Sequence, residues 1–231
     1  FWDIDGTLLT TARAGIHAWE QAAQDVLDRL VDFEDLPTAG RTDSQIATVI
    51  IEVCDLEPNA ERVARMLRAY EQHLPERLGW RQGTVLPNVR EVLDDLADDR
   101  NVCSLLLTGN TAAGAEAKLR HYGLFDDFAD AGGRLAGAFC ADGDDRDAIA
   151  RRALRVAADV VGAEVDGGQT VVIGDTPHDI SCGKTIGART LAVATGVFGA
   201  QELAAAGAWR TTDRLPKPPA LRELLGLGGT A

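Results

Sequence analysis

Apolar residues follow two different periods along the chain, and the change between them divides the sequence. Between about residue 11 and residue 87, apolar positions recur at helical spacing. Beyond residue 87, short apolar runs alternate with helical patterns, which is typical of a parallel β-sheet with crossover helices. The predicted helices cover 11–31, 43–54, 59–78, 88–98, 111–122, 147–161 and 177–186, and the predicted strands cover 102–107, 170–173 and 190–194, with a last short helix in the proline-rich tail.

The two patterns predict two structural units. Residues 1–10 and 88–231 are expected to form an α/β core, and residues 11–87 an inserted helical unit. Nothing from residue 11 to about residue 78 resembles a strand, and the chain is expected to cross between the two units near residues 10–13 and 79–87. Residues 125–128 and 138–139 are expected to be short connecting pieces. Phe1, Trp2 and Ile4 predict the end of a buried strand. Strands usually run about 5–6 residues, so we expect further apolar residues upstream of Phe1 in the natural protein.

Two carboxylates, Asp3 and Asp5, follow this first strand in the run Asp3-Ile4-Asp5-Gly6-Thr7. Alone, the run is equally compatible with an ordinary Asp-Gly turn. An EF-hand loop is excluded, because its glycine lies five residues after the first aspartate, whereas Gly6 lies three after Asp3. Ligands collect at the ends of strands in open α/β sheets, so the position favours a functional site.

Two later strand ends carry matching chemistry. The strand over 102–107 runs into Thr108-Gly109-Asn110-Thr111, and the strand over 170–173 runs into Gly174-Asp175-Thr176-Pro177-His178-Asp179. With the first run, these segments resemble three motifs of the haloacid dehalogenase-like superfamily of aspartate-nucleophile phosphatases. The resemblance extends in order and spacing over nearly the whole chain and is closest to the phosphoglycolate phosphatase-like branch. It implies a doubly wound, Rossmann-like parallel sheet with an inserted all-helical cap.

The resemblance implies a mechanism as well as a fold. Asp3 is expected to attack the phosphate and form an aspartyl-phosphate, and Asp5 to act as general acid and base. Mg²⁺, a hard cation that prefers oxygen ligands, is expected to be held by Asp3, the backbone carbonyl of Asp5, Asp175 and Asp179. Asp175 is the stronger candidate for a direct ligand, and Asp179 is expected to act through water or as an outer partner. Because true dehalogenases lack the second aspartate, Asp5 argues against halide displacement.

Phosphate binding is expected from Thr108 and the amides of Gly109 and Asn110, which lie where a strand enters a helix N-terminus. Taken alone, Thr108 fits a helix cap better, and only the other motifs favour a role in phosphate binding. In the helical unit, Arg41 of the run Gly40-Arg41-Thr42-Asp43 is a candidate for holding an anionic part of the substrate. A helix start with Thr42 or Asp43 as N-cap explains that run equally well.

The third family motif, usually a lysine, is missing from its expected segment. No lysine lies between Lys118 and Lys184, and Arg146 is our candidate replacement. Its alternative is a solvated residue in the first turn of a helix. Lys118 is the rival cation, but its position inside the predicted helix over 111–122 suggests a distant, solvent-facing side chain. Weaker candidates are His17, Trp19 and Arg81.

Composition narrows the remaining choices. The formal net charge of −13 argues against nucleic acid or an anionic membrane as a partner. The four cysteines show no C-x-x-C spacing, which argues against a zinc site and fits a reducing, cytoplasmic setting. No apolar run approaches the ~18 residues that indicate a transmembrane helix.

The sequence therefore predicts a Mg²⁺-dependent phosphatase that acts on a small phosphorylated metabolite. Two alternatives stay open: a phosphomutase that uses the same residues, and a catalytically idle member that binds a phosphometabolite. Neither the substrate nor the oligomeric state can be inferred from the sequence.

Overall fold

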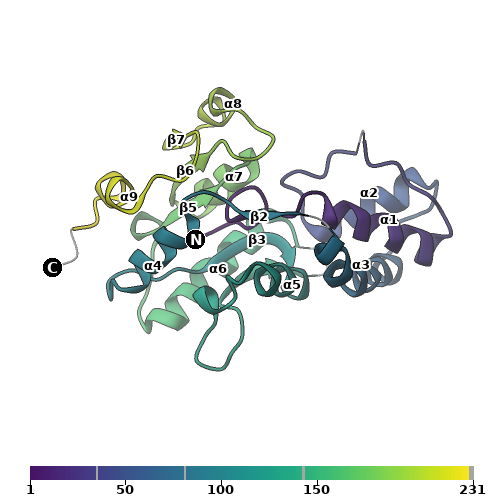
Figure 1. Ribbon diagram of the computed structural model, residues 1–231, viewed down its shortest axis with the longest axis horizontal. Helices are drawn as coiled ribbons and strands as arrows, with labels where there is room; N and C mark the ends of the chain where they lie inside the picture. Colours follow the sequence, from purple (N-terminus) through teal and green to yellow (C-terminus); the bar gives the residue numbers. More distant parts are fainter. Residues whose placement is uncertain (35, 81, 142–143, 229–231) are drawn as a thin grey trace.

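The structure of the protein is a computed structural model that describes residues 1–34, 36–80, 82–141 and 144–228. Arg81, one of the weaker candidates, lies outside the described residues. Figure 1 shows three helices gathered on one side of the molecule, apart from the sheet and its other helices. These three are α1 (Ala14–Leu27), α2 (Asp43–Val53) and α3 (Ala60–Trp80).

The three helices form as their apolar spacing predicts, and they pack on one another through buried side chains. Trp19 of α1 stacks on Tyr70 of α3, with ring centroids 4.1 Å apart and planes within 7°. A capping box starts α2, because the hydroxyl of Thr42 accepts from the amide of Gln45 while the Gln45 side chain accepts from the Thr42 amide. The prediction that Thr42 can act as an N-cap is therefore confirmed.

Two short strands connect the helices to the rest of the molecule. β1 (Leu9–Thr10) and β2 (Thr84–Val85) pair in antiparallel fashion. β2 lies within residues 79–87, where the chain is expected to cross back to the core, and so outside the stretch of residues 11–78 in which no strand is expected. A two-residue strand is too short to show a period of two, so the apolar pattern carries no sign of it.

The core is a parallel sheet whose first strand lies in its middle. Trp2 forms parallel bridges with Leu106 on one side and with Ile173 on the other. The order is thus β4, β3, N-terminal segment, β5, β6, β7, which corresponds to strands 3-2-1-4-5-6 in chain order. The strands are β3 (Leu106–Thr111), β4 (Gly137–Cys140), β5 (Val171–Gly174), β6 (Arg189–Val193) and β7 (Arg210–Thr212).

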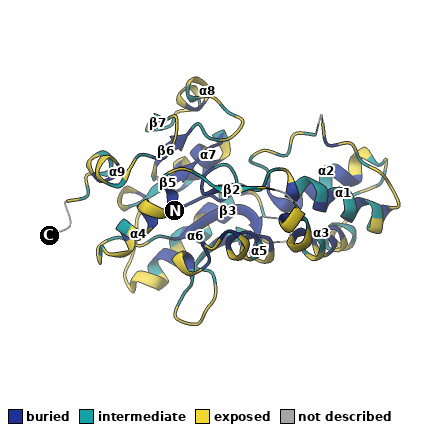
Figure 2. Ribbon diagram, viewed as in Figure 1, coloured by how far each residue is buried: buried dark blue, intermediate teal, exposed yellow. Residues whose placement is uncertain are grey.

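Helices cover both faces of this sheet, which confirms the doubly wound α/β fold. Leu107 and Val172 pack with residues of α6 and α7, whereas Leu106 and Ile173 pack into the cluster that contains residues of α4 and α5. Figure 2 shows the strands as buried and exposed residues on the outward sides of the helices. The helices are α4 (Val89–Ala97), α5 (Ala112–Tyr122), α6 (Arg146–Val161), α7 (Pro177–Ile186), α8 (Ala200–Ala205) and α9 (Pro218–Leu225), with 3₁₀ turns at Asp126–Phe128 and Gly167–Gln169.

Two strand predictions need correction. β3 begins at Leu106, four residues later than expected, because its partners on the two sides are Trp2 and Gly137. The piece at 138–139 is not a connection but part of β4, which pairs with β3. Gly137 allows that pairing, since a Cβ there would lie 2.6 Å from the Leu106 Cβ. In the described part of the chain, no helix is long and apolar enough to cross a membrane.

Candidate active site

Asp3 lies at the point where the strand order of the sheet reverses, between β3 and β5. Its amide donates to the carbonyl of Ile173 at 3.0 Å, and its side chain is buried. The chain then turns at Gly6, whose φ of +81° is a conformation that glycine adopts without strain. A Cβ on Gly6 would lie 2.4 Å from the Asp175 Oδ2, so this turn brings the two strand ends into contact.

Three carboxylates meet beside this turn. Asp3, Asp175 and Asp179 each present an oxygen, and these oxygens lie within 4.8 Å of one another. All three side chains are buried. The hydroxyl of Thr7 donates to Asp175 Oδ1 at 3.1 Å, and that of Thr176 donates to Asp179 Oδ2 at 2.7 Å. The carboxylates of Asp175, directly after β5, and Asp179, in α7, are thus each fixed by a hydrogen bond from a threonine hydroxyl.

The cluster carries more negative charge than its protein surroundings balance. Burial raises the pKa of Asp3 well above its usual range, and the charge of Asp179 raises it further, while Arg146 acts in the opposite direction. Burial and the charge of Asp179 raise the pKa of Asp175 to about 8. A divalent cation would relieve this repulsion, and buried carboxylate oxygens are the donors that Mg²⁺ prefers. The donor set therefore fits a hard metal ion.

Arg146, the candidate for the missing lysine, lies beside the carboxylates. It is buried at the start of α6, which Asp145 caps. Its Nη1 donates to Asp179 Oδ1 at 3.3 Å, and its Nε donates to the carbonyl of Gly40 at 3.0 Å. The alternative of a solvated first-turn residue is therefore wrong.

Asp5 lies near the end of β3 and contacts a second group of residues. Its Oδ2 accepts from Asn110 Nδ2 at 2.9 Å, and the same Nδ2 lies 2.8 Å from the hydroxyl of Thr108. Gly109 lies between Thr108 and Asn110 in the chain, and its backbone closely approaches that of Arg41. A Cβ on Gly109 would be 2.9 Å from the carbonyl oxygen of Arg41. The structure thus brings Thr108, Gly109 and Asn110 to the same strand edge as Asp3.

The helix that follows is capped by Thr111, not by Thr108. Thr111 precedes α5, and its hydroxyl accepts from the amide of Gly114 at 3.1 Å. Thr108 is fully buried within β3 and accepts from the amide and the side chain of Asn110. The capping interpretation of Thr108 is therefore wrong.

Lys118 is the clearest error of the sequence reasoning about the site. Instead of facing solvent, it is buried in α5, and its Nζ lies 2.6 Å from Asp5 Oδ2 and 2.5 Å from Asn110 Oδ1. Burial alone would lower the pKa of Lys118, but the carboxylates of Asp5 and Asp43 raise it above its ordinary value. The site therefore has two buried cations, Arg146 and Lys118.

A cavity of about 260 Å³ lies between the helices α1–α3 and the sheet. Asp3, Asp5, Lys118 and Arg146 line it from the core side. The helical side contributes Arg41, the candidate for holding an anionic part of the substrate, together with several further residues. Those residues include Arg13, Ile16, Trp19, Asp43, Ile46 and Tyr70.

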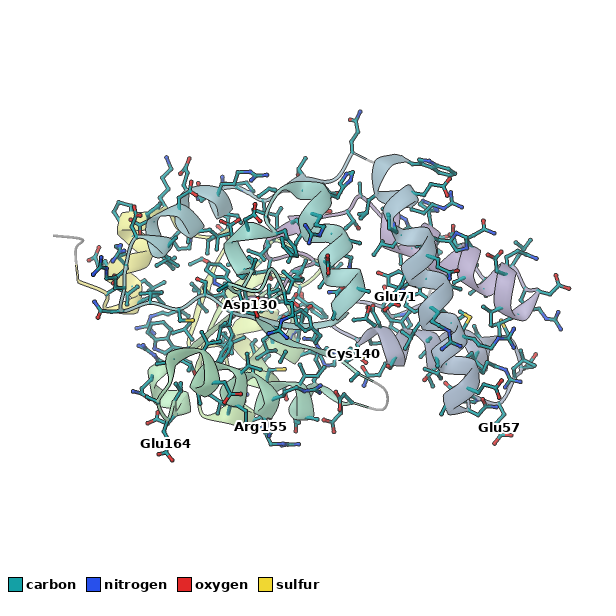
Figure 3. All side chains as sticks on the ribbon, turned by 90° about the horizontal axis from the view of Figure 1, so that it is seen from below. Glu57, Glu71, Asp130, Cys140, Arg155 and Glu164 are labelled. Atoms are coloured by element: carbon teal, nitrogen blue, oxygen red, sulfur yellow. The ribbon has the colours of Figure 1, made fainter. Side chains whose placement is uncertain are left out.

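Contacts around the cavity tie the helical side to the core. Asp43 of α2 accepts from the amide of Thr111 at 2.7 Å, and burial raises the pKa of Asp43 to about 6. The Cys140 thiol lies 3.2 Å from the Ser44 hydroxyl, and Figure 3 shows Cys140 at this junction between the two parts. Together with the bond from Arg146 to Gly40, these contacts hold α2 against the strand ends.

Sequence reasoning missed several of these residues, although some left a signal. Buried residues of α5 recur at Gly114, Ala115, Lys118, Leu119 and Tyr122, so Lys118 lies within the apolar stripe of its helix. A lysine in such a stripe indicates a buried partner. The sequence predicts only an N-cap role for Asp43, and nothing near it indicates its contact with Thr111 at the end of β3.

Comparisons with known proteins show the family of this chain. Residues 1–184 match the model of the haloacid dehalogenase-like hydrolase family. The chain belongs to this family. No curated protein matches its sequence.

Solved structures with the same fold cover nearly the whole chain. A hydrolase from Pseudomonas syringae aligns over 97% of this chain and 96% of its own, with 22% identity and a TM-score of 0.68. CbbY from Rhodobacter sphaeroides in complex with phosphate aligns over 92% of each chain, with 18% identity and a TM-score of 0.71. A predicted phosphoglycolate phosphatase from Haemophilus somnus 129pt aligns over 96% of each, with 17% identity and a TM-score of 0.69.

Proposed function

We propose that this protein is a Mg²⁺-dependent phosphatase that hydrolyses a small phosphorylated metabolite through an aspartyl-phosphate on Asp3. The observation that carries the proposal is the buried group of Asp3, Asp175 and Asp179 with Arg146 beside it. Hydrolysis of a phosphate monoester needs a nucleophile in a site that neutralises the charge of the phosphoryl oxygens. The ionised carboxylate of Asp3 can attack phosphorus without a base to remove a proton from it.

Each side chain has a proposed role. Mg²⁺ would be held by Asp3, the backbone carbonyl of Asp5 and Asp175, and when bound it would supply positive charge for the phosphoryl oxygens. Asp179 would act through water, because its Oδ2 already accepts from Thr176 and its Oδ1 from Arg146. The phosphoryl group would be bound by Arg146, Thr108 and the amides of Gly109 and Asn110.

The reaction would begin with attack of Asp3 on phosphorus, while Asp5 gives a proton to the departing ester oxygen. Asp5 would then accept a proton from the water that hydrolyses the aspartyl-phosphate. Residues 11–87 would form a cap over this site, with Arg41 near the part of the substrate that does not react. A cytoplasmic setting belongs to the same proposal and is supported by four cysteines that are free.

Phosphate release from p-nitrophenyl phosphate with Mg²⁺, and without a bisphosphate activator, tests this function. A panel with phosphoglycolate and sugar phosphates would then identify the substrate class; the resemblance to CbbY and to the Haemophilus somnus protein supports these choices. A phosphomutase would instead isomerise a sugar phosphate and require the bisphosphate. An idle member would bind inorganic phosphate, seen as a thermal shift, without turnover of any ester.

A further inference from the structure

Asp5 is the more exposed of the two carboxylates in the first motif, Asp3 and Asp5, yet its side chain is held by two hydrogen bonds. Its side chain is 42% exposed, so water alone would leave it free to change rotamer. Two groups constrain it: Lys118 Nζ at 2.6 Å and Asn110 Nδ2 at 2.9 Å. Both contact the same oxygen, Oδ2. Within the described residues, no hydrogen bond reaches the other oxygen, Oδ1.

The partners of Asp5 are themselves fixed. Lys118 is only 5% exposed and is also bonded to Asn110 Oδ1, so lysine, amide and carboxylate form a closed triangle. The Asn110 amide group is oriented in turn by the buried hydroxyl of Thr108. Such a connected set resists rotation more strongly than any of its single bonds would.

We propose that Lys118 is a positioning residue that holds Asp5 with Oδ1 directed at the departing ester oxygen. This inference rests on the proposed phosphatase function. As the bond from phosphorus to the ester oxygen breaks and the bond to Asp3 forms, the proton on Asp5 Oδ1 passes to the ester oxygen, which leaves as an alcohol. Asp5 Oδ2 accepts from Lys118 and Asn110 before and after this transfer, so the triangle is kept.

Leaving-group dependence separates positioning from other roles. An alkyl phosphate releases a strongly basic alkoxide and needs the proton from Asp5, whereas acetyl phosphate releases a weakly basic carboxylate and does not. The ratio kcat/KM reports the steps up to formation of the aspartyl-phosphate, so it isolates the proton donation. A lysine that only bound phosphate or stabilised the fold would affect both substrates equally.

The test compares the wild-type protein with Lys118→Met, which keeps an unbranched side chain one atom shorter but removes its charge and its hydrogen bonds. We expect kcat/KM for a metabolite-like alkyl phosphate to fall at least about 30-fold, which is less than the roughly 10²–10⁴-fold of complete loss of a general acid because Asp5 itself remains, and that for acetyl phosphate to fall less than about 3-fold. Asn110→Ala, which removes the other contact to Asp5 Oδ2, should show the same selectivity. It provides a second variant should Lys118→Met not fold.

Two controls complete the design. In the double variant Lys118→Met with Asp5→Asn, no loss should appear beyond that of Asp5→Asn alone, because both changes remove one function. Lys118→Arg should recover part of the alkyl phosphate activity. Equal losses for both substrates, or no loss for either, would overturn the inference. If the folded wild-type protein releases phosphate from neither substrate with Mg²⁺, the proposed function itself is wrong.

Discussion

The two buried cations of the site are held in opposite ways. Arg146 bonds to Asp179, which is fully buried, and to the backbone carbonyl of Gly40, so both of its partners are fixed. Lys118 bonds to Asp5, whose side chain is 42% exposed and faces the cavity. Arg146 is therefore a preorganised charge, whereas Lys118 restrains a side chain that would otherwise move.

This difference assigns each cation to one half of the proposed chemistry. The Arg146 side contains the three carboxylates and would stabilise charge on the phosphoryl group and the metal ion. The Lys118 side contains Asp5 and Asn110 and would control the proton. Variants on the first side should affect every ester, and variants on the second only those with poor leaving groups.

The largest effect is expected at Asp3, on the Arg146 side. Asp3→Asn should abolish turnover of all esters, because the amide is nearly isosteric but a poor nucleophile. The fold should survive, and the metal-free variant should be at least as stable as the wild type, because burial and Asp179 disfavour ionised Asp3. Steady-state rates and thermal unfolding would check both. More than about a hundredth of wild-type activity in the variant would contradict covalent catalysis at Asp3.

Metal removal should act mainly through the carboxylates of the Arg146 side. EDTA should silence the enzyme, Mg²⁺ should restore it, and Ca²⁺ should restore it poorly because Ca²⁺ prefers longer bonds, at about 2.3–2.6 Å, and more ligands. Mg²⁺ should also raise the melting temperature of the wild type, as ligands of the native state do.

The melting temperature provides the control. Lys118→Met should keep the Mg²⁺-dependent shift, and Asp175→Asn should lose most of it. Full activity in chelator, or an equal shift in Asp175→Asn, would argue against the proposed metal site.

Much of this arrangement was predictable, because the chemistry lies at strand ends. Asp3, Thr108 and Asp175 could be identified because each is a polar residue at the end of an apolar run. Parallel strands bring such positions to one edge of the sheet. The helices α2 and α7 were predicted to within a residue, since capping residues and apolar spacing agree there.

The errors have physical causes that the local sequence does not show. β4 contains Gly137, which has no side chain to contribute to an apolar pattern, and pairs with β3 only in the folded sheet. Lys118 is buried because Asp5, 113 positions away, provides its partner. The charge that compensates a buried lysine is a tertiary feature, so the position of Lys118 inside a predicted helix led to the wrong expectation of a solvent-facing side chain.

Arg146→Ala should have the next largest effect and sharpens the contrast between the two sides. We expect kcat/KM to fall roughly 10²-fold, as for loss of one preorganised charge-stabilising donor. The loss should be similar for alkyl and acetyl phosphates, unlike that of Lys118→Met. Arg146→Lys should recover part of it, because the charge remains although the fork of donors is lost.

Removal of Arg146 also leaves Asp179 buried without its cationic partner, so the variant should be less stable. The rates should therefore be measured at a temperature at which every variant is folded. If Arg146→Ala lowered kcat/KM only for alkyl phosphates, Arg146 and not Lys118 would support proton donation, and the assignment of the two sides would be wrong.

The smallest effect is expected at Asp43, on the Lys118 side, and it concerns stability. The pKa of Asp43 is raised to about 6 in the folded protein, chiefly by burial, while the charge of Lys118 partly offsets this. The native state therefore binds a proton more readily than the unfolded chain, and the stability that this provides is complete below about pH 4 and lost as the pH rises through 6. Asp43→Asn keeps an oxygen acceptor for the Thr111 amide and removes the ionisation.

At pH 7.5 the Asn variant should be more stable than the wild type by about 1–2 kcal/mol, and the gain should shrink as the pH falls from 6 to 4. Urea unfolding at several pH values measures it, and the other carboxylates cancel because both proteins contain them. In a Lys118→Met background, ionised Asp43 loses the charge that offsets its burial, so the same substitution should stabilise the protein more. A gain that does not change with pH would mean that ionised Asp43 is not destabilising. An equal gain in both backgrounds would mean that the charge of Lys118 does not stabilise ionised Asp43.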